Sequence, residues 1–261
     1  MTKLTVVPTF VLVHGSWHGA WCWSRVLPIL RRAGYDAHAV TLTGVGERAH
    51  LLSNDINLTT HINDVLGLIE SEELTNIVLV GHSYGGRVIT GVAEALLNAG
   101  KVTLQHLVYL DAVVPKSGES WSSTHAPEVI TARTQAAKDF GKLHGVDAFP
   151  PPDASVFGLS GDDAAWVNRR QTPQPLGVYL DGQSFDEPRL ARFPRTFINC
   201  NSPALATIEV SRERVRADKS WQFVELACGH DAMVSHPQAL VNILLSEPIT
   251  RRHSREGGNP N

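Results

Sequence analysis

One short stretch, residues 78–86, limits what this chain can fold into more than any other. An apolar run leads into the pattern glycine, any residue, serine, any residue, glycine, with Ser83 at its centre. The run predicts a buried strand, and a helical pattern begins at Arg87, directly after the motif. A strand, a very tight turn and a helix would hold Ser83 in a strained backbone, with its neighbours pressed together. The glycines at 81 and 85 leave room for that approach, so the stretch predicts an exposed nucleophile.

The motif alone is short, and glycine-rich turns between a strand and a helix can show the same pattern without any catalytic role. The predicted helix adds one physical argument, because its N-terminus points at Ser83 and favours negative charge that develops there. An acid and a base follow later in the chain, in the order that such a site needs, and they favour the catalytic interpretation.

Short apolar runs alternate with helical patterns along most of the chain. The runs that predict buried strands lie at 9–13, 36–42, 77–80, 104–110, 196–200 and 221–226. This alternation is typical of an α/β fold with a mostly parallel sheet of about six strands and helices on both faces. The chain has 261 residues, 43% of them hydrophobic, which is enough for one large core.

The alternation stops between residues 115 and 192, where Pro, Gly and Asp are frequent. We predict that this segment is an inserted helical cap within a single domain, whose core comprises residues 1–114 and 193–249. Residues 250–261 contain arginines and the sequence GGNP and have nothing to bury, so they are predicted to be a disordered tail.

Polar residues follow several predicted strands, at the edge where open α/β sheets hold their active sites. Asp111 comes after the strand that follows the serine motif, and His230 stands in a small-residue loop after the last strand. The order Ser83, Asp111, His230 supplies a nucleophile, an orienting acid and a base. The backbone N–H groups of Ser16 and Tyr84 are the expected oxyanion hole.

Composition excludes several other classes of function. The net charge of −3 argues against a nucleic-acid partner, and no apolar run approaches the length of a membrane span. Three cysteines without metal-ligand spacing fit a reducing compartment, and the first residues lead into a strand with no signal-peptide cleavage site. We therefore expect a cytoplasmic protein, and the chemistry above requires no metal or organic cofactor.

Three stretches together carry a resemblance to a known family. They read FVLVHGSWHGAW at 10–21, VGHSYGG at 80–86 and GHDAM at 229–233. They resemble the α/β-hydrolase superfamily and, within it, the branch of plant methylesterases, hydroxynitrile lyases and related bacterial carboxylesterases. The resemblance implies a cofactor-free esterase with a helical cap, a small-molecule ester as its partner, and a homodimer.

One departure from the plant members concerns the acid of the triad. In those proteins it follows the strand that corresponds to 196–200, whereas this chain has Asn201 there and no carboxylate. Asp111 is the best substitute, and haloalkane dehalogenases of the superfamily can place their acid similarly. Asp231 is an alternative acid, but residues adjacent in sequence, such as Asp231 and His230, seldom have the geometry for a contact between their side chains. Glu209 lies too far beyond the strand at 196–200 to take the position of the acid.

Two positions separate an esterase from the lyases that it resembles. The lyases have threonine in place of Gly15 and lysine in place of Asp231, and an aspartate has the wrong charge to hold departing cyanide. A hydroxynitrile lyase, a C–C bond hydrolase on the same triad and a small-molecule receptor with little turnover remain the alternatives.

Three aromatic residues in the predicted cap complete the expected site. They could line a pocket for small to medium, apolar or aromatic esters, and they are Trp121, Phe157 and Trp166.

Overall fold

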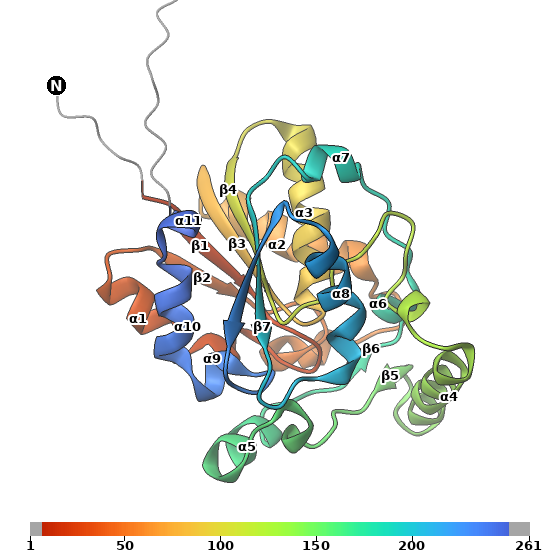
Figure 1. The fold of residues 1–261 in the computed structure, drawn as a ribbon. Helices are drawn as coiled ribbons and strands as arrows, with labels where there is room; N and C mark the ends of the chain where they lie inside the picture. Colours follow the sequence, from red (N-terminus) through yellow and green to blue (C-terminus); the bar gives the residue numbers. More distant parts are fainter. Residues whose placement is uncertain (1–6, 251–261) are drawn as a thin grey trace, which may run out of the picture.

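The chain folds around one six-stranded sheet, shown in Figure 1 for a computed structural model that describes residues 7–250. All its pairings are parallel, and the strand order is β2-β1-β3-β4-β7-β8. The strands are β1 (Thr9–Val13), β2 (Ala37–Val40), β3 (Asn76–His82), β4 (Thr103–Leu110), β7 (Arg195–Cys200) and β8 (Trp221–Leu226). The predicted sheet is confirmed, and its strands were placed to within about two residues at each end.

Helices cover both faces of the sheet because successive strand residues point to opposite sides. In β1, Val11 and Val13 enter one core, while Phe10 and Leu12 enter the other. The first core is covered by α2 (Leu58–Ser71), α3 (Gly85–Ala99) and α8 (Glu209–Ala217). The second is covered by α1 (Leu27–Arg32), α9 (Ala232–Ser235), α10 (Pro237–Leu244) and α11 (Glu247–Thr250).

Residues 115–192 add no strand to the main sheet. They form α4 (Pro127–His144), α5 (Gly161–Asn168), α6 (Gly177–Leu180), α7 (Glu187–Leu190) and a small antiparallel pair of β5 (Ala148–Phe149) and β6 (Gln174–Pro175). In Figure 1, α4 and α5 lie in the lower part of the picture, beyond the end of the sheet. The division into core and cap remains a prediction.

The cap segment is attached to the core through a buried arginine of α3. Arg87 donates hydrogen bonds to the carbonyl oxygens of Glu119 at 3.0 Å and Asp181 at 2.9 Å. Both ends of the cap segment are thereby joined to the helix that follows Ser83.

Two sequence predictions concern the predicted tail and the absence of a membrane-spanning helix. Thr250 ends α11 and is buried, whereas the rest of the predicted tail, residues 251–261, lies outside the described residues, as do residues 1–6. Between residues 7 and 250, no helix combines the length and the apolar character needed to cross a membrane.

Candidate active site

The turn after β3 presents Ser83 at the carboxyl edge of the sheet. Its φ of 53° lies in the left-handed region, which residues other than glycine seldom adopt. A Cβ at position 81 would lie 2.6 Å from the Gly85 carbonyl oxygen, and one at position 85 would lie 2.8 Å from that of His14. The predicted need for glycine at 81 and 85 is confirmed, because both distances are too short for a side chain.

Asp111 and His230 come together at this edge from β4 and from the loop after β8. His230 Nδ1 donates to Asp111 Oδ2 at 2.7 Å, and both side chains are buried. An ionised carboxylate can only accept, so the hydrogen bond assigns the proton to Nδ1 and leaves Nε2 free to act as a base.

The base also lies beside the serine motif. Its ring centroid is 4.4 Å from that of His82, the residue before Ser83, but in the described part of the chain His230 makes no hydrogen bond to Ser83. Catalytic hydrogen bonds often tighten only when substrate binds. The contact between nucleophile and base therefore remains a prediction.

Arg212 of α8 is a second partner of Asp111 that the sequence did not reveal. One of its terminal nitrogens donates to Asp111 Oδ1 at 2.9 Å, and both side chains are buried. Its other N–H groups donate to Asn199, to the Leu205 carbonyl and to Glu209. The pair fixes the second carboxylate oxygen of Asp111, and it places Glu209 with the arginine rather than with His230.

Asp231, the other rival acid, makes its hydrogen bond to His18 and not to its neighbour His230. Its Oδ2 accepts a hydrogen bond from His18 Nε2 at 3.0 Å, and its Oδ1 lies 3.6 Å from His82 Nε2. Burial by itself would lower the pKa of His18, but the attraction and hydrogen bond of Asp231 raise it. Burial would raise the pKa of Asp231, and the facing His18 lowers it instead.

The loop that carries Ser16 lies directly against the nucleophile. A Cβ at Gly15 would be 2.7 Å from the Cβ of Ser83. His14 holds the loop: its Nδ1 donates to the Gly15 carbonyl at 2.7 Å, and its Nε2 accepts the Leu42 N–H at 3.1 Å. Burial lowers the pKa of His14 to about 3, so this histidine is a neutral support.

The second candidate oxyanion donor, Tyr84, is anchored by its side chain. Its hydroxyl lies 3.0 Å from His61 Nδ1, and the ring is fully buried. Because His61 Nε2 donates to the Thr43 carbonyl, Nδ1 is the acceptor for the tyrosine hydroxyl. The anchored side chain keeps the backbone N–H of Tyr84 at the start of α3, directly after Ser83.

The three predicted pocket residues have different surroundings. Phe157 lies beside His230, with ring centroids 5.8 Å apart, and Trp121 lies 5.6 Å from the ring of Tyr84. Trp166 packs instead against Trp21, at 5.1 Å. The structure thus brings two of the three next to candidate catalytic residues and places the third elsewhere.

The group His82, His230 and Asp231 has the spacing of metal ligands, since their ligand atoms lie within 4.8 Å of one another. His230 Nδ1 already bonds Asp111, and Asp231 Oδ2 already bonds His18. The atoms left over are Asp231 Oδ1, His82 Nδ1 and His230 Nε2. The last of these is the base of the expected triad, so a metal ion held here would occupy the atom that has to accept the proton of Ser83.

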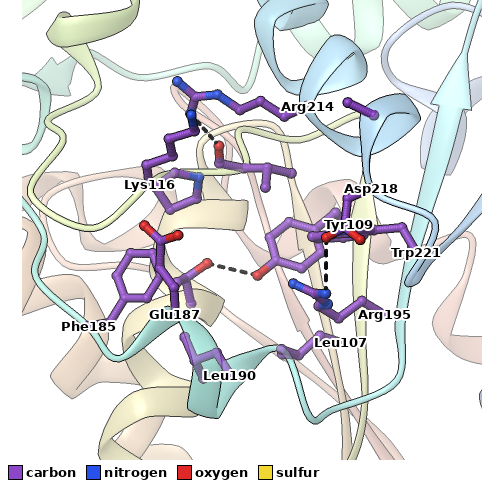
Figure 2. A pocket seen from close by; sticks show the side chains of 14 residues that line it. Leu107, Tyr109, Lys116, Phe185, Glu187, Leu190, Arg195, Arg214, Asp218 and Trp221 are labelled. Carbon is purple, nitrogen blue, oxygen red and sulfur yellow. Dashed lines mark hydrogen bonds and ion pairs between the residues drawn. The ribbon is translucent and has the colours of Figure 1, made fainter.

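The hollow in Figure 2 is a separate place, with a volume of about 390 Å³. Tyr109 and Trp221 form its aromatic wall, and Ser83, Asp111 and His230 do not line it. Its arginines are already paired, Arg195 with Asp218 and Arg214 with Glu119. We therefore do not assign the reaction to this hollow.

A parallel sheet whose third strand leads through a tight serine turn into a helix defines the class of the protein. The model of the alpha/beta hydrolase family matches residues 10–243, and the chain belongs to that family. It is 39% identical over 241 residues to the carbendazim hydrolyzing esterase of Nocardioides sp. (strain SG-4G). The aligned residues cover 90% of this chain and 97% of that esterase.

More distant relatives agree with this assignment. The chain is 24% identical over 253 residues to the putative methylesterase 14, chloroplastic, of Arabidopsis thaliana, covering 92% of this chain and 72% of that protein. The solved structure of an extracellular α/β-hydrolase from a Paenibacillus species has a TM-score of 0.77 at 20% identity, with 94% and 99% of the two chains covered. The relatives confirm the expected enzyme class, a carboxylic ester hydrolase.

Proposed function

We propose that the protein is a serine carboxylesterase that hydrolyses small to medium, apolar or aromatic carboxylic esters through an acyl-enzyme. The observation that carries the proposal is the 2.7 Å hydrogen bond between His230 and Asp111 beside the Ser83 turn. Similarity to a full-length esterase supports the reaction type. The three cysteines are free, which supports a reducing compartment such as the cytoplasm.

In the first half of the reaction, Ser83 Oγ attacks the ester carbonyl carbon while its proton passes to His230 Nε2. The negative charge that develops on the carbonyl oxygen is held by the N–H groups of Ser16 and Tyr84. The ester C–O bond then breaks, and His230 returns the proton to the departing alcohol. The acyl group remains on Ser83.

In the second half, water replaces the alcohol. His230 takes a proton from the water as it attacks the acyl carbon, and the carboxylic acid leaves when Ser83 regains its proton. Asp111 keeps the imidazole in the required tautomer and stabilises its charged form in both halves. The net reaction consumes one ester and one water and releases one alcohol and one acid.

Two positions favour the esterase over a hydroxynitrile lyase on the same triad. A threonine at position 15 would bring its Cβ to 2.7 Å from Ser83 and 2.9 Å from His82, so this backbone has no room for it. Asp231 supplies a negative charge where the lyases have a lysine, and that charge is committed to His18.

The aromatic residues near the candidate catalytic groups support the proposed polarity of the substrate. Phe157 lies beside both His230 and Trp17, and Trp121 covers the ring of Tyr84. Aromatic walls favour apolar or aromatic groups in the ester through burial of apolar area. Trp166 packs on Trp21, so its place in the pocket stays a prediction.

A panel of esters with varied acyl and alcohol groups, carbendazim included, tests the proposal on wild type, Ser83→Ala and Ser220→Ala. We expect Ser83→Ala to lose at least about 10,000-fold in kcat. Ser220 lies at the amino end of β8, where its hydroxyl accepts from Arg195, and its variant should retain full activity. Near-wild-type hydrolysis by Ser83→Ala would refute the mechanism.

Two further outcomes would indicate one of the alternatives. One equivalent of alcohol released in a burst, followed by almost no turnover, would identify a receptor. Cleavage of cyanohydrins without hydrolysis of any ester would identify a lyase.

A further inference from the structure

A fully buried carboxylate beside the catalytic histidine is not used by the mechanism above. Asp231 has no exposed surface, and a buried carboxylate is costly unless it is paired. Its closest partner is His18 Nε2 at 3.0 Å, and His18 is itself buried. The ring of His18 is held between Trp21, stacked at 5.1 Å, and Phe157, edge-on at 5.6 Å.

The hydrogen-bond partners of His18 define its protonation. Its Nδ1 lies 2.7 Å from the carbonyl oxygen of Ser16, which can only accept. Its Nε2 faces the carboxylate of Asp231, which also only accepts when ionised. Both ring nitrogens therefore carry protons, and His18 is an imidazolium that forms a charged pair with Asp231.

His82, on the other side of Asp231, is in a different state. Its Nε2 donates to the carbonyl oxygen of His230 at 3.1 Å, while its Nδ1 is buried without a hydrogen-bond partner. Burial and the nearby His230 lower the pKa of His82 well below its ordinary value. The Asp231 charge is thus balanced by one histidine, His18.

These contacts connect Asp231 to every part of the proposed reaction centre. Through His18 it fixes the carbonyl of Ser16, whose N–H is a candidate oxyanion donor. Through its place in the chain it adjoins His230, and its Oδ1 lies 3.6 Å from His82, which precedes Ser83. No comparable charged pair bridges the oxyanion loop and the base loop among residues 7–250.

We propose that Asp231 is a positioning residue of the esterase, which uses a protonated His18 to hold the oxyanion loop at a fixed place relative to the base. The inference rests on the proposed function, because it assigns the Ser16 N–H to the oxyanion. The His18 charge also lies on the oxyanion loop, so it favours the negative charge of the transition state. Displacement of such a loop by about 1 Å can cost about 100-fold in rate.

The experiment compares kcat and KM per titrated active site, counted with a serine-reactive fluorophosphonate, in wild type, Asp231→Asn and Asp231→Ala. Asn can keep the hydrogen bond to His18 but not the charge, so we expect kcat to fall about 10-fold, and about 100-fold for Ala, with KM nearly unchanged. Asp163→Asn is the matched control, since Asp163 makes a partly exposed pair with Arg25 at 2.7 Å.

A purely structural role for Asp231 would reduce the number of titrated sites and leave kcat per site within about two-fold of wild type, which would overturn the proposal. If Asp231→Ala fails to fold, kcat per titrated site can still be measured in Asp231→Asn. Double substitution with His18→Gln should cost no more than the worse single change, because both act through one link. Full additivity would contradict that link.

A readout independent of activity separates failure of this inference from failure of the proposed function. The ring ¹⁵N chemical shifts of His18 should show two protonated nitrogens at neutral pH in wild type and a neutral ring in Asp231→Asn. A neutral His18 in an active wild-type enzyme would overturn the inference alone. A charged His18 in a protein that neither hydrolyses esters nor reacts with the fluorophosphonate would overturn the proposed function, and with it the positioning role, but not the charged pair of His18 and Asp231.

Discussion

Two buried carboxylates lie near His230 and bond different partners. Asp111, which is 119 residues away in the chain, bonds the imidazole ring at 2.7 Å. Asp231, the next residue in the chain, bonds His18 instead, and among the described residues its carboxylate makes no hydrogen bond to the ring of His230. These two adjacent side chains bond different partners, so nearness in sequence was a poor guide to the acid.

The partners of the two carboxylates also differ in kind. Asp111 is paired with Arg212, and a guanidinium group is a permanent cation in proteins. Asp231 is paired with His18, whose charge can be removed by a rise in pH. In the proposed mechanism, the carboxylate beside the permanent charge orients the base, whereas the carboxylate beside the titrating charge supports the oxyanion loop.

Substitution of Asp111 should cause the largest loss of activity among the changes that test this comparison of Asp111 with Asp231. Asp111→Asn removes the acceptor that selects the Nδ1–H tautomer of His230, because an amide can also donate to that nitrogen. We expect kcat to fall about 10,000-fold with the fold intact, as measured by steady-state hydrolysis per titrated site and by circular dichroism.

The same measurement on Asp231→Asn and Glu209→Gln decides between the three carboxylates. Glu209 pairs with Arg212 and Arg216 at 3.1 Å each, so its variant should retain most of the activity. If activity persists in Asp111→Asn and is abolished in one of the other two, the assignment of Asp111 as the acid is wrong.

The next largest effect concerns the arginine behind Asp111. Arg212→Met removes one partner of a buried pair and leaves the other charge uncompensated, so we expect the free energy of unfolding to fall by about 3–5 kcal/mol. Arg216→Met is the control on the same helix, because Arg216 is 48% exposed where Arg212 is 1% exposed. Its loss should stay within about 1 kcal/mol. Urea unfolding measures both, and equal losses would show that Arg212 is not the support inferred here.

Much of the fold could be predicted from the sequence because its signals are local. Apolar runs and intervening helical patterns define the strands, and the glycines at 81 and 85 identify the serine turn on steric grounds. The positions of Asp111 and His230 followed from the rule that strand ends in a parallel sheet share one edge.

The rest of the site depends on contacts between distant parts of the chain. Arg212 lies 101 residues from Asp111 within a charged helix, and nothing local separates it from Arg214 or Arg216. The pairing of His18 with Asp231 spans 213 residues, and the chain has 12 histidines. The position of Trp166 was uncertain for a related reason, because the segment between 115 and 192 has no regular pattern to fix its packing.

The smallest expected effect is a pH dependence of stability at the pair of Asp231 and His18. The pKa of Asp231 is lowered from its ordinary 3.8, so its contribution is present above that pH and is lost as the pH falls further. The pKa of His18 is raised from its ordinary 6.5, so its contribution is full below that pH and is lost as the pH rises through the raised value. The pair should therefore stabilise the fold most between about pH 4 and pH 6.5.

Urea unfolding of wild type and Asp231→Asn at pH 5 and pH 9 measures this window. We expect the difference in unfolding free energy between the two proteins to be larger at pH 5, where His18 is charged, than at pH 9. Besides His18, the titratable groups that face Asp231 are His82, which burial keeps neutral, and His230, which is already bonded to Asp111. A difference that is equal at both values, or larger at pH 9, would mean that the charge of His18 does not titrate between these two pH values, and the contrast drawn here between the partners of the two carboxylates would be wrong.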